Sequence, residues 1–298
     1  MFQHYPDYHH LVASTQLVLA MFGMGMVTRL RDFVEIVLEP KPMLTGFLYQ
    51  LIAIPLLTAL MVHAISFPPE VAMGFILLSA MPGGSLSNVY THLGRGNVAL
   101  SVALTGVRTL LAVITAPIIL RLMGGHYLPP QIIMPVGSIM QEIFVFLLLP
   151  LAAGMLLARF IDPNPARIGS KWVVRASLVV VGILVVGSLG SGRIDFSRYA
   201  WWIPLSVFLY CLIIQIIILR GARHGLGFSQ RDSMALGIES SMKNVNLAVL
   251  ISASLFSIEG EHAHFGGGVL FTILLYGGVA LVVAAVPAIS NFRQHPAR

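Results

Sequence analysis

The sequence predicts an all-α polytopic membrane protein with about nine transmembrane helices. Its 298 residues are 57% hydrophobic and only 10% charged, and the mean hydropathy is +0.86. Soluble domains carry roughly 25% charged residues, because polar surface must cover their core. The basic residues behind the net charge of +6 are scattered, so no nucleic-acid partner is expected. The single cysteine, Cys211, excludes an internal disulfide framework and a cysteine metal cluster.

A membrane-spanning helix needs about 20 mostly apolar residues, and nine segments meet this requirement. In chain order they are about 11–28, 43–65, 71–94, 97–122, 132–160, 171–190, 200–220, 232–255 and 267–290. The N-terminal "MFQHYPDYHH" lacks the basic region and cleavage site of a signal peptide, so the first segment is expected to be a retained span. Together the segments predict a single membrane domain over residues 1–298.

Two of the nine segments are interrupted. Residues 71–94 contain "MPGGSLSN" (81–88) in mid-span, and residues 232–255 contain "GIESSMKNVN" (237–246). Pro, paired Gly and Asn interrupt helices, and broken backbone survives in a bilayer only where protein buries it or where it lines a wet cavity. Each broken segment precedes a long span, and the two run antiparallel. This pattern is typical of inverted repeats whose discontinuous helices meet at the membrane midplane.

The distribution of basic residues predicts an N-terminus outside and a C-terminus in the cytoplasm. With that orientation the inner loops hold most of the Lys and Arg residues, including Arg29 and Arg31, while the outer loops hold only Arg121, Arg193 and Arg198. Short loops rich in Lys and Arg stay on the cytoplasmic side.

Polar residues expected at membrane depth gather on the two broken segments and on the span after the first of them. Ser101 and Thr105 lie four positions apart and so share one helix face. Ser87 and Asn88 begin the half-helix that follows the first break. With the carboxylate of Glu239, these oxygens suit a hard monovalent cation such as Na⁺. Placing an ionisable side chain inside a membrane costs free energy, so a residue such as Glu239 favours a functional interpretation.

The half-helices after the two breaks begin near residues 85–88 and 243–246. Their free N–H groups and positive dipole ends attract anions, so an organic-anion site is predicted beside the cation site. Structural interpretations stay open at this point. Hydroxyl groups in membrane helices could bond the carbonyl one turn back, Glu239 could pair with Lys243 within a helix, and the Asn side chains could join helices.

Four motifs resemble the bile acid:sodium symporter family. They are "MFGMGMVTRLRDF" (21–33), "YQLIAIP" (49–55), "MPGGSLSNVYTHLGRGNVALSVALT" (81–105) and "IESSMKNVNLAVL" (238–250). The resemblance implies an inverted-repeat transporter fold with two crossed discontinuous helices. It also implies a panel and a core domain. The chain begins at what looks like the second span of the ten-span members, so it is similar to the nine-span type.

The resemblance assigns each segment to one of the two domains. The panel helices would be about 11–28, 132–160 and 171–190. The core helices would be about 43–65, 71–94, 97–122, 200–220, 232–255 and 267–290.

The resemblance also implies a set of binding residues. The first sodium site falls on Ser87, Asn88, Ser101, Thr105 and Glu239. The second falls on Gln50, Glu239, Ser240, Met242 and Lys243, with backbone carbonyls from Ser240 and Met242. Substrate contacts are expected from Ser85, Asn88, Asn244, Asn246, Arg108 and Tyr276. No catalytic residue and no cofactor are implied, with Na⁺ as the coupling ion and the only metal.

Two departures from the family pattern bear on mechanism and substrate. Lys243 stands where the family usually has Gln at the second sodium site. Like charges 4 Å apart repel by roughly 4 kcal/mol even at an effective dielectric constant of 20. We therefore predict that the Lys243 ammonium replaces the second Na⁺, so that transport couples to one Na⁺, or to a proton if Lys243 titrates. Leu275 and Tyr276 stand where some members have a His-Asn pair, which leaves the substrate open.

The predicted function is secondary active symport of a small organic anion by alternating access, in the inner membrane of a bacterium. The substrate would be a bile acid or a smaller oxo or hydroxy acid. The alternatives are proton-coupled or uncoupled transport and a regulatory member that has lost transport. An intramembrane enzyme is not expected, because the zinc, Ser/Lys and aspartyl motifs of such enzymes are missing. Arg108 either binds a substrate carboxylate or braces the core, with Glu142 as a candidate partner. The oligomeric state stays open.

Overall fold

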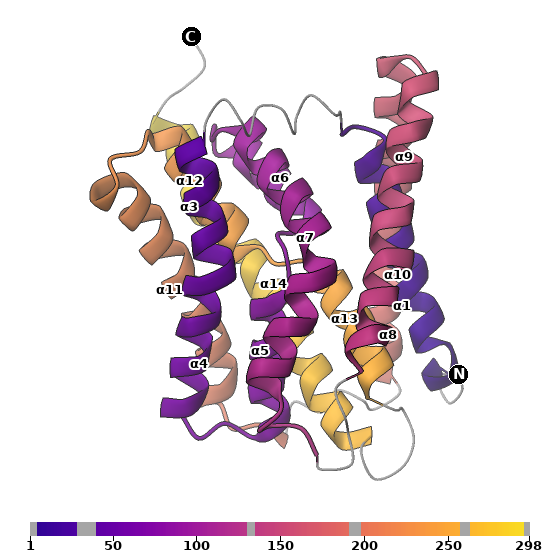
Figure 1. The fold of residues 1–298 in the computed structure, drawn as a ribbon, viewed down its shortest axis with the longest axis vertical. Helices are drawn as coiled ribbons and strands as arrows, with labels where there is room; N and C mark the ends of the chain where they lie inside the picture. The colour runs from indigo at the N-terminus through magenta and orange to yellow at the C-terminus, as the bar shows by residue number, and fades with distance from the viewer. Residues whose placement is uncertain (1–4, 29–39, 130–134, 191–197, 257–262, 295–298) are drawn as a thin grey trace.

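The computed structural model describes residues 5–28, 40–129, 135–190, 198–256 and 263–294, and in these ranges the chain is mostly helical, without a sheet (Figure 1). The all-α prediction is therefore confirmed. Arg29, Arg31 and Arg193, which the orientation argument uses, lie outside the described residues.

The helices follow the predicted segments in order. They are α1 (Tyr5–Gly25), α3 (Pro40–Leu48) continuing through η1 (Tyr49–Ala53) into α4 (Ile54–Ala64), α5 (Pro69–Ala80), α6 (Ser85–Leu93), α7 (Val98–Gly124), α8 (Val136–Glu142) continuing through η2 (Ile143–Leu148) into α9 (Leu149–Phe160), α10 (Pro163–Gly190), α11 (Trp202–Arg220) with η4 (Gly221–Gly225), α12 (Gln230–Ser241), α13 (Val245–Leu255) and α14 (Ala263–Gln294). The stretches η1 and η2 are single π-helical turns within longer helices, a feature often found at functional sites, and η4 ends α11.

Five helices among the described residues are long and apolar enough to cross a membrane. They cover Pro40–Ala64, Val98–Gly124, Val136–Phe160, Trp202–Gly225 and His264–Ile289. Three shorter apolar helices accompany them, within α1, α5 and α13. Many large apolar side chains are exposed on these helices, as expected for surfaces that face lipid. The number of membrane crossings stays a prediction.

Both predicted interruptions are present. The first separates α5 from α6 at residues 81–84, and the second separates α12 from α13 at residues 242–244. The two breaks cross through an antiparallel bridge between Gly83 and Lys243. Its backbone hydrogen bonds run from Gly84 N–H to the Met242 carbonyl and from Asn244 N–H to the Pro82 carbonyl, each 2.8 Å long. These bonds satisfy amide groups that the broken helices would otherwise leave unpaired inside the membrane.

Helix α1 packs against both α9 and α10 along one side of the molecule (Figure 1). Two glycines set the distance between α1 and α9. A Cβ atom on Gly25 would lie 2.2 Å from the Leu151 carbonyl oxygen, and one on Gly154 would lie 2.2 Å from the Phe22 carbonyl oxygen. Small residues of this kind allow membrane helices to approach closely. The remaining helices surround the crossing, and the assignment of panel and core domains stays a prediction.

Candidate functional site

A cluster of oxygen atoms surrounds the Glu239 carboxylate beside the helix crossing. Thr105 donates a hydrogen bond of 2.7 Å to Oε1, and Ser101 donates one of 3.1 Å to Oε2. The Ser87 hydroxyl also bonds Oε2. The Asn88 side-chain oxygen lies 2.8 Å from the Ser101 hydroxyl and 3.4 Å from the Thr105 hydroxyl. Helices α6, α7 and α12 thus bring together all five residues predicted for the first sodium site.

The cluster has the donor set of a site for a hard monovalent cation. The side chains of Ser87, Ser101, Thr105 and Glu239 are buried, and every polar atom they contribute is oxygen. The carboxylate accepts hydrogen bonds only from neutral hydroxyl groups, and an ionised carboxylate in a low-dielectric interior is stabilised by a cation in direct contact. If each hydroxyl rotates, its lone pairs can face a cation placed against the carboxylate. The residues therefore fit Na⁺ well.

Gly83 in the first break is required by the position of the Glu239 carboxylate. A Cβ atom at residue 83 would lie 1.8 Å from Oε1 of Glu239. Gly83→Ala is therefore expected to displace the carboxylate, to destabilise the fold by about 1–3 kcal/mol and to reduce the stabilisation by Na⁺. Thermal unfolding of the purified protein across a Na⁺ titration measures both effects.

The matched control is Gly182→Ala, because a Cβ atom at residue 182 meets nothing within 4 Å. This variant should respond to Na⁺ as the wild type does. An unchanged Na⁺ response in Gly83→Ala would contradict the close fit between the crossing and the carboxylate.

The second predicted site holds two cationic side chains. Gln50 uses its side-chain oxygen to accept a hydrogen bond of 3.4 Å from Nε of Arg108. The Met242 carbonyl already accepts the hydrogen bond from Gly84 N–H, and the Ser240 hydroxyl has no partner among the described residues. The Lys243 side chain is 5% exposed, and its ammonium also lacks a hydrogen-bond partner within the described part of the chain.

Lys243 does not form the helical pair with Glu239 that the spacing of four residues allows. Helix α12 ends at Ser241, so Lys243 lies in the break and its backbone bridges to Gly83. Its ammonium is nevertheless close enough to interact electrostatically with Glu239 and with Arg108. The carboxylate attracts the Lys243 ammonium, whereas the guanidinium repels it.

Arg108 is fully buried on α7, one turn beyond Thr105. Besides Gln50, its guanidinium donates from Nη1 to the Thr115 hydroxyl, 3.3 Å away, while Nη2 has no partner among the described residues. Glu142 lies instead beside His10, 3.7 Å from its ring nitrogen. The structure therefore places the guanidinium against the second predicted site.

A cavity of about 700 Å³ lies beside the crossing, between helices α1 and α10 on one side and α14 on the other. The walls are mostly apolar, and the polar residues that line it are Gln16, Ser177, Lys243, Asn244 and Asn246. A second cavity of about 540 Å³ shares Leu86 and Val174 with the first and is lined by the ends of α1 and the beginnings of α7 and α10. Together the two cavities reach from the crossing toward the face on which α1 ends.

The predicted substrate residues take different positions around this cavity. Asn244 caps α13 by accepting a hydrogen bond of 3.1 Å from Leu247 N–H, and its Nδ2 has no partner among the described residues. Asn88 belongs to the oxygen cluster but also lines the second cavity. Tyr276 is buried, and its hydroxyl donates to the Ser241 carbonyl at 2.5 Å. The side chain of Ser85 lies outside those that the structure describes.

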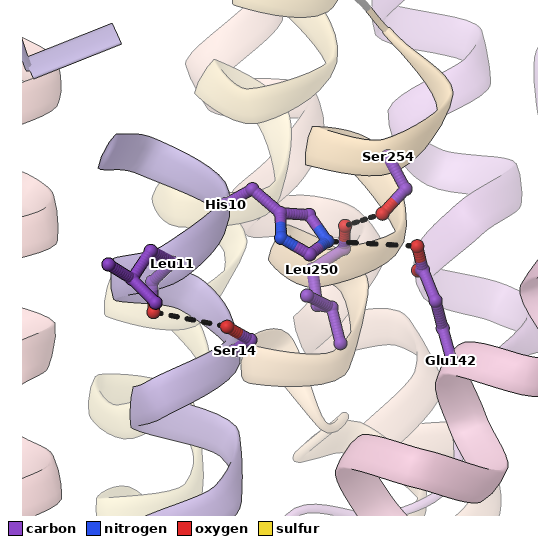
Figure 2. Close-up of polar contacts among 6 residues, drawn as sticks. All are labelled: His10, Leu11, Ser14, Glu142, Leu250 and Ser254. Carbon is purple, nitrogen blue, oxygen red and sulfur yellow. Dashed lines mark hydrogen bonds and ion pairs between the residues drawn. The ribbon is translucent and has the colours of Figure 1, made fainter. Parts of the chain in front are cut away.

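The opposite face of the molecule, where α1 begins, is closed by contact between α1 and α13. Here the Nε2 atom of His10 lies 3.7 Å from Oε1 of Glu142 at the end of α8. The Ser254 hydroxyl of α13 lies beside the same carboxylate and donates to the Leu250 carbonyl (Figure 2). The His10 ring also packs edge-on against Phe146, with ring centroids 6.0 Å apart. These contacts join three separate helical segments at one end of the molecule.

Sequence reasoning missed several polar residues that the structure places in or near the site. Gln16 and Ser177 line the cavity, and each lies in a predicted span that is mostly apolar. Gln215 accepts a hydrogen bond of 3.1 Å from the Ser241 hydroxyl at the end of α12. An amide within a predicted span was the available signal for both glutamines, because such groups need a partner inside the membrane.

Comparison with known proteins agrees with this geometry. A family model described as the Sodium Bile acid symporter family matches residues 15–191. The chain belongs to this family. Members of the sodium bile acid symporter family are transporters rather than enzymes, as expected, and the chain is an integral membrane protein.

Individual relatives within the sodium bile acid symporter family extend the similarity beyond the matched region. The chain is 32% identical to the uncharacterized sodium-dependent transporter YocS of Bacillus subtilis, over 81% of this chain and 73% of that protein. It is 30% identical to the probable sodium/metabolite cotransporter BASS1, chloroplastic, of Arabidopsis thaliana, over 80% of this chain but only 58% of that relative. It is 26% identical to the ileal sodium/bile acid cotransporter of Cricetulus griseus, over 93% of this chain and 79% of that protein.

Proposed function

We propose that the chain is a Na⁺-coupled secondary active transporter of small organic anions. The observation that carries this proposal is the buried Glu239 carboxylate, which three hydroxyl groups and one amide oxygen surround directly beside a cavity at the helix crossing. The names of the relatives, which describe a sodium-dependent transporter, a sodium/metabolite cotransporter and a sodium/bile acid cotransporter, support the same function.

The cation and the substrate have separate places in this proposal. Na⁺ binds against Glu239 and joins α6, α7 and α12, because its ligands come from all three helices. The substrate occupies the cavity, where its anionic group faces the crossing and its apolar part faces the walls. The donor at the crossing is Nδ2 of Asn244, at the start of α13, where the helix dipole also favours an anion.

Coupling would use one Na⁺ rather than two. The second site already contains the Lys243 ammonium and the Arg108 guanidinium, which donates a hydrogen bond to the Gln50 side chain. A further cation there would face repulsion of roughly 4 kcal/mol from each charge 4 Å away, even at an effective dielectric constant of 20. The fixed cations thus stand in place of the second ion. A proton-coupled transporter is the second candidate, because the buried Lys243 ammonium lacks a hydrogen-bond partner in the described part of the chain.

The two faces of the molecule differ in a way that supports alternating access. The cavities extend toward the face on which α1 ends, which the distribution of basic residues predicts to be cytoplasmic. The contact among His10, Glu142 and Ser254 closes the opposite face. The described state is therefore proposed to be the inward-facing one. An outward-facing state requires α13 to separate from α1 and α8 at this contact.

Transport assays with purified protein in liposomes test the proposal. We expect an inward Na⁺ gradient to drive uptake of at least one member of a panel of 2-oxo acids, hydroxy acids and bile acids, with one Na⁺ per substrate turnover. A stoichiometry of two or more Na⁺ would disprove the single-site mechanism. Uptake driven by a pH gradient and insensitive to Na⁺ would support the proton-coupled candidate instead.

A further inference from the structure

The second predicted site contains three buried hydrogen-bond donors without acceptors. Nη2 of Arg108, Nε2 of Gln50 and Nζ of Lys243 are each buried and have no hydrogen-bond partner among the described residues. The side chains are 0%, 0% and 5% exposed, respectively. Buried donors in folded proteins almost always have partners, and a charged donor without one is the most costly case.

Two of these donors belong to side chains in contact, and the third, Lys243, lies within electrostatic range of Arg108. Nε of Arg108 is 3.4 Å from the side-chain oxygen of Gln50, so the two side chains touch. Lys243 is close enough to Arg108 for their charges to repel each other. Because the Gln50 oxygen accepts from Arg108, the Gln50 amide presents its NH₂ group as a further donor.

The polar groups nearby make hydrogen bonds to other residues and not to these three donors. The Tyr210 hydroxyl is 2.6 Å from the Thr58 hydroxyl, and the Tyr276 hydroxyl donates to the Ser241 carbonyl. The nearest acid, Glu239, accepts hydrogen bonds on both of its oxygens from Ser87, Ser101 and Thr105. None of these contacts supplies an acceptor to Arg108 or Lys243.

The buried charges of the described residues do not balance. With all three groups ionised, Arg108 and Lys243 contribute two positive charges and Glu239 contributes one negative charge, which leaves +1 among these buried side chains. Na⁺ at the Glu239 cluster would raise this sum to +2. A buried ionic group is tolerated only when it is paired, so an anion is the missing component.

We propose that Arg108, Gln50 and Lys243 bind a small monovalent anion at the place where the family pattern implies a second Na⁺. The anion is either an inorganic halide or the carboxylate of the transported substrate, which share the same need for convergent donors. This inference rests on the part of the proposed function in which the second site takes no Na⁺. It does not depend on transport itself.

Equilibrium binding of ³⁶Cl⁻ to the purified full-length protein tests the halide, with sodium sulfate as the background salt at a constant Na⁺ concentration. We expect saturable binding in the wild type. The affinity of Arg108→Gln should be at least about tenfold weaker, because this variant lacks a charge-assisted hydrogen bond to the anion. Arg121→Gln, an exposed arginine on the same helix, is the matched control and should bind as the wild type does.

Competition distinguishes the two sources of the anion. If acetate or a transported acid displaces ³⁶Cl⁻, the site accepts carboxylates as well as halide. If ³⁶Cl⁻ does not bind but Arg108→Gln abolishes binding of a radiolabelled carboxylate substrate, the substrate itself supplies the anion. If neither anion binds in an Arg108-dependent manner, the inference is wrong, even where Na⁺-driven uptake is observed.

Gln50→Glu gives a second test that does not rely on removing a residue. The new carboxylate would face Arg108 and supply the missing negative charge, so ³⁶Cl⁻ binding should disappear while thermal stability without halide increases. Should Lys243 instead be neutral, the added carboxylate would bring the sum of the buried charges to −1, and stability would fall. That result would overturn the inference.

Discussion

Glu239→Gln is expected to abolish both the stabilisation by Na⁺ and Na⁺-driven uptake. The carboxylate supplies the only negative charge of the oxygen cluster, and the three hydroxyl groups around it are neutral. The variant keeps the shape of the side chain but removes the charge that attracts the cation, so binding should weaken by about 3 kcal/mol or more, roughly a hundredfold. Thermal unfolding across a Na⁺ titration, followed by uptake in liposomes, measures the two effects.

The control for this experiment is Glu142→Gln, which makes the same chemical change within another helix. Glu142 lies beside His10 at the closed face, away from the oxygen cluster. It should keep the stabilisation by Na⁺. A Glu239→Gln variant that still responds to Na⁺ with wild-type affinity would show that the cation binds elsewhere.

Lys243→Gln is expected to change the coupling stoichiometry from one Na⁺ to two. Glutamine replaces the ammonium with a neutral oxygen ligand, which restores the residue that the family pattern has at this position. Lys243 then no longer repels a second Na⁺, although the Arg108 guanidinium remains hydrogen-bonded to Gln50. The stoichiometry is obtained from the Na⁺ gradient that balances a known substrate gradient in liposomes, and a sigmoidal dependence of uptake on Na⁺ should accompany it.

Lys41→Gln provides the control for the loss of one positive charge, because Lys41 is exposed at the start of α3. Its stoichiometry should remain one. If Lys243→Gln also remains at one, Arg108 alone excludes the second ion, and the double variant Arg108→Gln with Lys243→Gln identifies that case by gaining the second Na⁺.

Much of the fold follows from local sequence signals. The apolar segments are long enough to specify helices, and "PGG" at 82–84 specifies a break because it combines a missing N–H group with two flexible residues. Helix α10 begins earlier than predicted, at Pro163 rather than near residue 171. The polar residues of its first two turns concealed this start. A helix that continues beyond the bilayer no longer needs apolar side chains, so hydropathy cannot locate its end.

The candidate site was predictable to the extent that its residues share a helix face or a motif. Ser101 and Thr105 are an example, since their spacing places both hydroxyl groups toward Glu239. The contact between Arg108 and Gln50 was not predictable in this way. It joins α7 to the π-helical turn between α3 and α4, and the direction of a side chain across such an interface depends on packing that no local pattern contains.

The bridge at the crossing has a consequence for amide exchange with solvent deuterium. The N–H groups of Gly84 and Asn244 lie in backbone that is not helical, where exchange is ordinarily fast. Each donates across the crossing to the other broken segment, so neither can exchange unless the two segments separate. Their protection therefore reports whether the crossing moves as a single unit. Slow exchange at both amides during turnover would mean that the α5–α6 and α12–α13 pairs travel together, which keeps Ser87 of α6 beside Glu239 of α12.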